Sequence, residues 1–269
     1  MNRSQPVESP EMNNNTASRR DPMNTPEYGI MYNVEDSYWW YVGIREIARS
    51  ILEGVLPRDR RLKILDAGCG TGGNLGLLGE FGDVFGLELS REAMGFLKKR
   101  SFDRFTTATV TDIPYASGAF DLVDVFYVNE CLSDDAPAMR EYYRVLKPGG
   151  VLCLFEVASE ALRGEHDMAV GIMHRYTRRE LIERIEAAGF KMLRATYANT
   201  ILHPPIFLLR RIRNLLKPVS KPEEAKSDFD RAPGFLHGIF KATLLIEARL
   251  LKFMNLPFGV TVIAVAQKS

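Results

Sequence analysis

From Leu62 onward, short apolar segments of strand character alternate with helical segments, and this alternation constrains the fold more than any other feature of the sequence. Strands that are regularly separated by helices pair in parallel through right-handed crossovers, so the pattern predicts a doubly wound α/β sheet. Ligands bind such sheets beyond the carboxyl ends of the strands. The predicted strands are 63–67, 84–89, 106–109, 121–128, 151–157, 191–198 and 259–267, and the predicted helices include 74–80, 136–146, 177–188 and one that opens at Ser90.

A glycine-rich string, LDAGCGTGGN, follows the first of these strands and leads into a helix. Glycines at such a junction let backbone N–H groups approach a ligand, and the helix N-terminus favours anionic groups. Gly68, Gly70 and Gly73 also satisfy the dinucleotide pattern GxGxxG, so the glycines alone leave a nicotinamide enzyme open. Asp66, two residues before Gly68, favours a cofactor with a positively charged end, because its carboxylate would repel a pyrophosphate.

ILDAGCGTGGN resembles the first motif of the class I S-adenosylmethionine-dependent methyltransferases, and three later segments resemble the motifs that follow it in that family. They are GLELS (86–90), TDIPYASGAFDLVDV (111–125) and RVLKPGG (144–150). The resemblance covers roughly residues 60–157 and implies a seven-stranded, Rossmann-like sheet that ends in an antiparallel hairpin, formed here by 191–198 and 259–267. It implies S-adenosylmethionine as the cofactor and fits the small-molecule branch of the family.

In this family the acidic residue of the second motif binds both ribose hydroxyls and that of the third motif approaches the adenine amino group, which implies Glu88 and Asp112 here. Many small-molecule members carry Leu-Glu-His after the fourth strand. This chain has Asn129-Glu130-Cys131 instead, so the role of that histidine cannot be carried over. The predicted cofactor-binding residues are Asp66, Gly68, Cys69, Gly70, Asn74, Glu88, Leu89, Asp112, Ile113, Val128 and Asn129.

Methyl transfer depends mainly on in-line positioning of the acceptor, although a hydroxyl acceptor usually needs a general base. The candidate catalytic residues are His174, in the string HRYTRREL, and Tyr127. The alternative for His174 is packing around the start of the next helix, which Thr177 caps and where Glu180 completes a capping box. The predicted substrate-binding residues are Trp39, Trp40, Arg45, Arg175, Tyr176 and His203.

Outside the predicted sheet, the chain divides by composition. Residues 1–25 are polar without apolar periodicity and predict a disordered leader, and 26–58 predict an aromatic and helical lid or, alternatively, a plain packing cluster. Residues 59–200 plus 259–269 form the predicted methyltransferase domain, and 201–258 a helical insertion with helices near 205–217 and 235–255. The first of these is basic and amphipathic, so it either covers the pocket as a substrate lid or makes weak contact with an anionic membrane surface.

The 35 basic and 34 acidic side chains nearly balance, so no general field attracts nucleic acid, and none is expected as a partner. Three isolated cysteines suggest neither zinc nor disulfides, no metal is expected, and the absence of a long apolar run or signal peptide favours a cytoplasmic protein. We therefore expect a methyltransferase that acts on an oxygen or nitrogen of a small molecule. The alternatives are an NAD(P)-dependent oxidoreductase and a cofactor-binding peripheral membrane or interaction protein without transfer activity.

Overall fold

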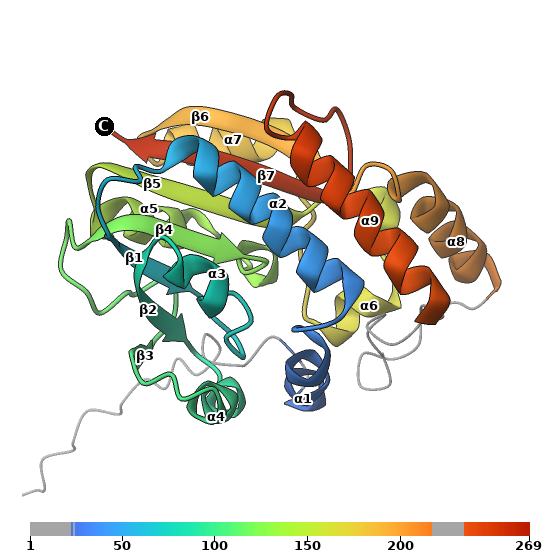
Figure 1. Cartoon of the computed structure of the whole chain (residues 1–269), viewed down its shortest axis with the longest axis horizontal. Coiled ribbons are helices and arrows are strands. Elements are labelled where there is room, and N and C mark those ends of the chain that lie inside the picture. Colours follow the sequence, from blue (N-terminus) through green and yellow to red (C-terminus); the bar gives the residue numbers. More distant parts are fainter. Residues whose placement is uncertain (1–22, 24, 217–233) are drawn as a thin grey trace, which may run out of the picture.

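The computed structural model describes residues 23, 25–216 and 234–269, so the leader predicted for 1–25 lies almost entirely outside the described residues. Within them, seven strands form one sheet in the order β3-β2-β1-β4-β5-β7-β6 (Figure 1). The first five strands pair in parallel, whereas β7 pairs antiparallel with both β5 and β6. The predicted doubly wound sheet with an antiparallel C-terminal hairpin is therefore confirmed.

The strands are β1 (Leu62–Ala67), β2 (Gly82–Glu88), β3 (Phe105–Thr107), β4 (Phe120–Phe126), β5 (Leu146–Val157), β6 (Phe190–Ala198) and β7 (Thr261–Lys268). The α-helices are α1 (Thr25–Val34), α2 (Trp39–Val55), α3 (Leu75–Gly79), α4 (Arg91–Lys99), α5 (Ala136–Val145), α6 (Glu165–Ala169), α7 (Arg178–Ala187), α8 (His203–Leu216) and α9 (Gly234–Leu250). Two 3-10 turns, η2 (Asn129–Cys131) and η3 (Glu160–Leu162), follow β4 and β5. Among these, α1 and α6 were not predicted from the sequence.

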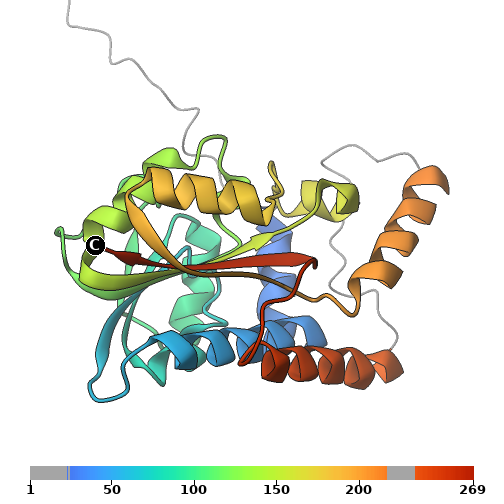
Figure 2. The same ribbon diagram turned by 90° about the horizontal axis from the view of Figure 1, so that it is seen from above.

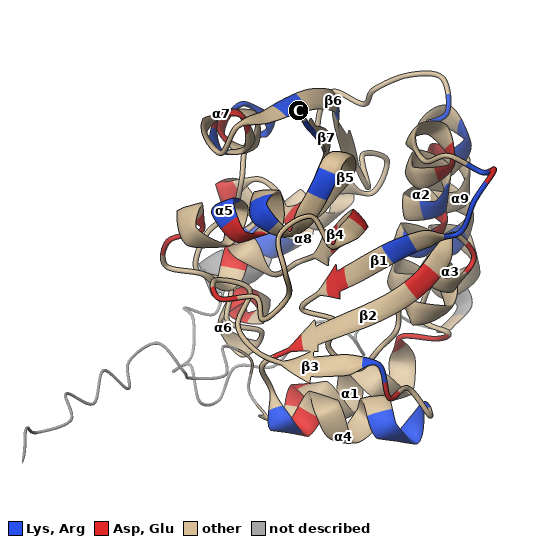
Figure 3. Cartoon of the chain, turned by 90° about the vertical axis from the view of Figure 1, so that its left-hand side faces the viewer, with Lys and Arg blue, Asp and Glu red and all other residues tan. Residues whose placement is uncertain are grey.

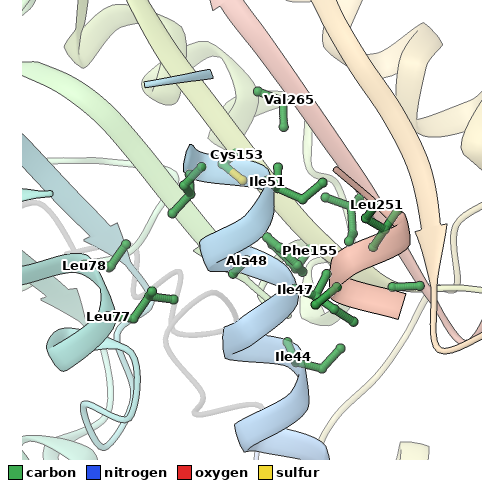
Figure 4. Close-up of a cluster of buried hydrophobic side chains, with 14 of the residues drawn as sticks. Ile44, Ile47, Ala48, Ile51, Leu77, Leu78, Cys153, Phe155, Leu251 and Val265 are labelled. Atoms are coloured by element: carbon green, nitrogen blue, oxygen red, sulfur yellow. The ribbon is translucent and has the colours of Figure 1, made fainter. Parts of the chain in front are cut away.

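Helices cover both faces of the sheet, because alternate side chains of each strand point to opposite faces. On β4, Leu122 packs beneath α2, α3 and α9, whereas Val123 and Val125 pack beneath α5 and α7. Figure 2 shows these two helix layers with the sheet between them. Figure 4 shows the first layer, where Ile47 and Ile51 of α2 lie beside Phe155 of β5. Each such fully buried aliphatic side chain contributes roughly 1.5–3 kcal/mol relative to its exposure to water.

The insertion between β6 and β7 is fastened to the sheet at its base. The buried carboxylate of Glu247 on α9 accepts hydrogen bonds from the backbone amides of Thr200 (3.1 Å) and Ile201 (2.7 Å), directly after β6. Further along, Leu256 forms a bridge with Tyr197 on the outer side of β6. No helix in the described residues is long and apolar enough to cross a membrane.

The long helices α2 and α9 lie side by side on one face of the sheet (Figures 1 and 2). A Cβ atom at Gly43 of α2 would lie 2.3 Å from Cδ1 and 2.5 Å from Cβ of Leu244 on α9. Only glycine therefore permits the two helix backbones to approach this closely.

We expect Gly43→Ala to lower the free energy of unfolding by about 1–3 kcal/mol, since the added methyl group forces α9 away from α2. Gly54, near the end of the same helix, has nothing within 4 Å of a Cβ position. Gly54→Ala is the matched control and should be neutral or stabilising by about 0.5–1 kcal/mol. Urea unfolding followed by circular dichroism measures both, and equal effects would contradict the close-approach argument.

Candidate active site

The glycine-rich turn lies where β1 ends, at the carboxyl edge of the sheet. Gly68 has a φ of 85°, and a Cβ atom there would lie only 2.4 Å from Val128 Cγ2. The amide of Gly68 donates to Leu87 O (2.8 Å), which ties the turn to the end of β2. The predicted cofactor residues Gly68 and Val128 are thus in contact, with the end of β2 alongside.

Glu88 at the end of β2 directs its carboxylate at the same turn. Oε2 accepts from the amide of Gly70 (2.8 Å) and Oε1 from the amide of Ser90 (2.7 Å), so two backbone amides fix its orientation. Hydrogen bonds to an ionised carboxylate are the stronger kind. Figure 3 shows acidic residues at the carboxyl ends of both β1 and β2, on adjacent strands.

Asp66 lies opposite Gly86 of β2 in the sheet register and is almost completely buried. Its Oδ2 has no hydrogen-bond partner within the described residues. Burial, followed by the charges of Glu88 and Glu35, raises the pKa of Asp66 to about 7. A buried carboxyl with an unpaired oxygen suits a positively charged ligand group, whose approach would favour the ionised form.

A second buried carboxyl, that of Asp124 on β4, stands beside Asp66 in the register and was not predicted. Its neighbour on β5 is the thiol of Cys153, and neither oxygen has a hydrogen bond of ordinary geometry in the part of the chain described. Burial raises the pKa of Asp124 well above its ordinary value, with a further contribution from Asp66. Asp66 and Asp124 are thus two adjacent buried carboxyls whose pKa values burial shifts upward.

The C-terminal end of α1 and the residue after it cover the glycine-rich turn. The carboxylate of Glu35, which follows α1, accepts from the hydroxyl of Thr71 (2.5 Å) and from Arg100 Nη2 (2.8 Å). Arg100, after α4, also donates from Nε to the carbonyl of Thr71 (2.9 Å). Met31 of α1 approaches the Cβ position of Gly70 to 3.3 Å. We name Glu35, Thr71 and Arg100 the lid latch, because they join α1, the turn and α4.

Arg45 on α2 lies against this latch. Its Nη2 donates to the backbone carbonyl of Glu35 (2.6 Å), while its Nη1 is buried and has no partner among the described residues. Burial lowers the pKa of Arg45, although an arginine remains charged at neutral pH. An unpaired, buried guanidinium nitrogen is able to bind a carboxylate. Arg45 thus lies beside the lid latch, and the substrate role predicted for it stays a prediction.

Two side chains of α5 hold the third motif (111–125) in place. Glu141 accepts from the amide of Ile113 (2.8 Å), and Arg144 donates to the carbonyls of Ile113 and Tyr115 (both 2.7 Å). Asp112 next to them is exposed. The RVLKPGG segment thus positions the predicted adenine-binding residue through the backbone that follows it.

Four further predicted cofactor residues differ in how the structure places their side chains. Asn129 is fully buried; its Oδ1 accepts from Tyr142 OH (2.9 Å), and its Nδ2 has no partner among the described residues. Burial raises the pKa of the Cys69 thiol, which stays neutral. Asn74 precedes α3 without a capping hydrogen bond, and Leu89 is half-buried after β2.

Tyr127, the first residue after β4, has a φ of 58°, which is uncommon for a non-glycine residue and is often found at functional sites. Its hydroxyl lies 2.9 Å from Thr261 Oγ1, and its ring lies 5.1 Å from that of Trp40. Burial raises the pKa of Tyr127 well above its ordinary value. The phenol is therefore a neutral hydrogen-bonding group and not a general base.

Arg175 and Tyr176 bind groups inside the protein, and their predicted substrate roles stay predictions. Arg175 is buried and donates to both carboxylate oxygens of Asp167 (2.8 and 2.6 Å) and to the carbonyl of Ala158 (2.9 Å). The hydroxyl of Tyr176 donates to Asp135 (2.7 Å). Both side chains fasten the 173–177 segment to the domain, because an arginine or tyrosine buried this deeply must find its partners within the protein.

His174 between them is half-exposed, with Nε2 2.9 Å from Glu180 Oε1. Thr177 Oγ1 accepts from the Glu180 amide as a helix cap, but the Glu180 carboxylate binds His174 and Arg184 and not the backbone of Thr177. Although the ring is partly exposed, its Nε2 atom is buried against the Glu180 carboxylate, and the catalytic role of His174 stays a prediction.

Two other predicted substrate residues lie within hydrophobic packing. Trp39 is buried between α2 and α9, with its ring 5.1 Å from that of Phe240. His203 at the start of α8 packs between Phe207 and Phe258. Of the tryptophan pair, Trp40 is the ring that contacts Tyr127, so the substrate role is better supported for Trp40 than for Trp39 or His203.

Sequence patterns missed several buried polar groups at this edge of the sheet. Glu130 and Glu156 lie together, with the Glu130 amide donating to Glu156 Oε2 (3.2 Å), and burial raises the pKa of both carboxyls. Asn199, just after β6, is buried, and neither amide atom of its side chain has a partner in the described parts of the chain. The described residues contain no group of three or more His, Cys, Asp or Glu arranged to hold a metal.

Comparisons with known proteins agree with this geometry. The family model for a methyltransferase domain matches residues 65–154. The chain is 35% identical over 109 residues to a malonyl-[acyl-carrier protein] O-methyltransferase of Enterobacter lignolyticus, covering 40% of this chain and 43% of that protein. It is 32% identical over 124 residues to a demethylmenaquinone methyltransferase of Chlorobaculum parvum, covering 45% and 49%. The chain thus spans less than half the length of these relatives.

A solved structure from Thermotoga maritima, described as a methyltransferase and possible histamine N-methyltransferase, has the same fold with a TM-score of 0.56. It is 17% identical and covers 91% of this chain and 96% of its own. The matched domain, the sheet order and the glycine-rich turn together define the class. Residues 65–154 form a methyltransferase domain of the class I type, whose cofactor is S-adenosylmethionine.

We expect Glu88→Ala to weaken binding of S-adenosylhomocysteine by at least about tenfold, since the variant loses charge-assisted bonds to the two ribose hydroxyls. Glu92→Ala on α4 is the matched control, because Glu92 is an exposed glutamate four residues further along. Isothermal titration calorimetry gives both affinities. An unchanged affinity in Glu88→Ala would refute the ribose assignment.

Proposed function

We propose that this chain transfers a methyl group from S-adenosylmethionine to an oxygen or nitrogen of a small molecule. The observation that carries the proposal is the set of groups around the glycine-rich turn, which matches the two ends of that cofactor. Asp66 and Glu88 are acidic, and Arg45 offers a buried, unpaired guanidinium nitrogen. Glu88 would bind the ribose, Asp66 would face the positive amino and sulfonium end, and Arg45 would bind the carboxylate.

The acceptor would lie beyond the carboxyl end of β4 and the start of β7. Trp40 and Tyr127 provide an aromatic wall there, and the paired hydroxyls of Tyr127 and Thr261 provide a hydrogen-bonding end. A site of this kind fits a largely apolar molecule with one polar group. The curated relatives named above act on an acyl-carrier-bound malonyl group and on demethylmenaquinone, and the second of these agrees with an apolar acceptor.

S-adenosylmethionine supplies an activated methyl group, so the residues of this chain need chiefly to position the acceptor and to accept one proton. Tyr127 would orient the acceptor through its hydroxyl. His174 would take the proton, with Glu180 holding its ring in place. The segment 26–58 would act as the lid, closed by the lid latch, which excludes water from the site.

The direct test compares binding of S-adenosylhomocysteine and NADH by calorimetry, and selective binding of NADH would overturn the proposal.

His174→Ala should lower the turnover number on a model acceptor at least tenfold with little change in cofactor affinity. His237→Ala, which replaces a histidine on α9 that packs against Tyr38, is the matched control. Equal losses of turnover and cofactor binding in His174→Ala would assign His174 to folding instead.

Affinity for S-adenosylhomocysteine should rise with pH. The pKa of Asp66 is about 7 in the free protein, and binding of a positively charged amino group requires its ionised form. Below that pKa the ligand must displace a proton, so the affinity at pH 6 should be roughly tenfold lower than at pH 7.5. Asp66→Asn should bind more weakly but with a flat profile. An identical pH profile in wild type and Asp66→Asn would assign the titration to another group, such as Glu35.

A further inference from the structure

Three polar side chains form a row across the sheet. Asp66 of β1 lies opposite Asp124 of β4, and Asp124 lies opposite Cys153 of β5. Because side chains alternate between the two faces of a strand, register partners on neighbouring parallel strands point to the same face. Here it is the face covered by α2 and α3, since Ile64 and Leu122, two residues before the acids, belong to the cluster packed under these helices.

The two acids of this row have fewer partners than buried acids need. Asp66 is 1% exposed, and Asp124 is completely buried. Asp66 Oδ2 and both carboxyl oxygens of Asp124 have no hydrogen-bond partner of ordinary geometry among the described residues. Buried polar groups normally have partners, and an unpaired buried charge is costly. These oxygens must therefore be satisfied by a proton held between the two acids or by a bound group.

Asp121, on the same strand as Asp124, shows how this chain holds a carboxylate that serves the fold. It accepts from Arg60 Nη2 (2.9 Å), from the amide of Lys63 (2.8 Å) and from Lys147 Nζ (2.9 Å). Despite burial, these bonds lower the pKa of Asp121 to about 2. Asp124 has no such set of donors, so a role in the fold alone does not account for an acid at this position.

Among the described residues, the charged groups that act on this pair of acids are themselves acidic. Burial raises the pKa of Asp66, followed by the charges of Glu88 and Glu35. Burial also raises the pKa of Asp124, followed by the charge of Asp66. The pair therefore lacks a positive charge until a cationic ligand arrives.

The other titratable groups on this face are neutral. Burial raises the pKa of the Cys153 thiol and of the phenols of Tyr41 and Tyr127, which pack against the same cluster. The helices above the row contribute apolar side chains, with Ile51 of α2 beside Cys153 (Figure 4). Within the described residues, Asp124 is therefore the available carboxyl donor to Asp66.

We propose that Asp124 is a positioning residue for the positively charged amino group of the cofactor, and that it acts through Asp66. Asp124 keeps its proton and donates it in a hydrogen bond to the Asp66 carboxylate, which binds the ammonium group. Neighbouring strands lie about 4.8 Å apart, a separation that an O–H···O bond between two aspartate side chains can span. The inference rests on the proposed function, in which Asp66 faces the amino end of the cofactor.

The division of roles within the pair follows from position. Two carboxylates side by side in a buried site repel each other, so one of them keeps its proton. Asp66 lies two residues before the glycine-rich turn, whereas Asp124 lies between Asp66 and Cys153. Asp66 is therefore the acid that a ligand cation can reach, and Asp124 the acid that supports it.

Asp124→Val tests this assignment, because valine removes the donor and keeps water out of the space. Isothermal titration with S-adenosylhomocysteine across the neutral pH range measures the effect. We expect the midpoint of the affinity profile to rise by at least about one pH unit, since the Asp66 carboxylate loses a charge-assisted hydrogen bond. Affinity near neutral pH should fall about fivefold and largely recover about 1.5 pH units higher. Asp124→Asn should restore the wild-type profile, because its amide N–H replaces the lost donor.

Two further variants separate this role from one in the fold. Asp66→Asn/Asp124→Val should bind no more weakly than Asp66→Asn, because Asp124 acts through a carboxylate that is already absent. Asp121→Asn is the matched control on the same strand, and it should leave the midpoint in place because Asp121, with a pKa of about 2, stays ionised throughout the range. Thermal unfolding should show Asp124→Val to be at least as stable as wild type, since a buried unpaired acid is costly.

An unchanged midpoint in Asp124→Val would overturn the inference. So would a lower midpoint, which would make Asp124 a second negative charge, an equal shift in Asp124→Asn, or additive losses in the double variant. If the valine variant does not fold, Asp124→Leu is measured in the same way. A flat wild-type profile would overturn the proposed role of Asp66 as well, whereas a midpoint that Asp66→Asn removes and Asp124→Val leaves in place would overturn this inference alone.

Discussion

Parallel pairing of β1 with both of its neighbours is the constraint on which the site depends. The register sets Asp66 beside Gly86 on one side and beside Asp124 on the other. The carboxyl ends of β1, β2 and β4 therefore meet at one edge, and the groups that follow them, although far apart in the sequence, become neighbours. The glycine-rich turn can lie at that edge only because Gly68 leaves room for Val128.

A second property of this edge is the number of acids that it buries. Burial raises the pKa of Glu35, Asp66 and Asp124, and of the Glu130–Glu156 pair nearby. Removing carboxyl groups from water costs free energy unless they are protonated or paired, so this concentration of acids does not stabilise the fold by itself. This cluster of acids favours binding of a positively charged group, which agrees with the charge of the cofactor's sulfonium end.

The sequence predicted the sheet, and it predicted that the strand-end motifs assigned to the cofactor meet at one edge, because strands and such motifs are encoded locally. Asp66, Gly68 and Glu88 lie in short motifs at strand ends, where position in the chain fixes position in space. The lid latch could not be found in this way, since Glu35 and Arg100 are 65 residues apart and belong to no pattern. The partner of Arg175 could not be predicted, because an arginine beside a histidine looks the same in a sequence whether it faces substrate or a buried aspartate. The period of α8 likewise identified an apolar side without saying whether that side faces protein or water.

The bridge between Tyr197 and Leu256 has a consequence for how the chain avoids association with other sheets. β6 is the last strand of the sheet, and an uncovered last strand offers unpaired amides and carbonyls to any extended chain. Here the segment after α9 lies along that strand, and Arg194 donates from β6 to the carbonyls of Leu251 and Met254. The insertion is therefore also a cover for the sheet's open border, so a shortened chain without it would expose a strand prone to aggregation.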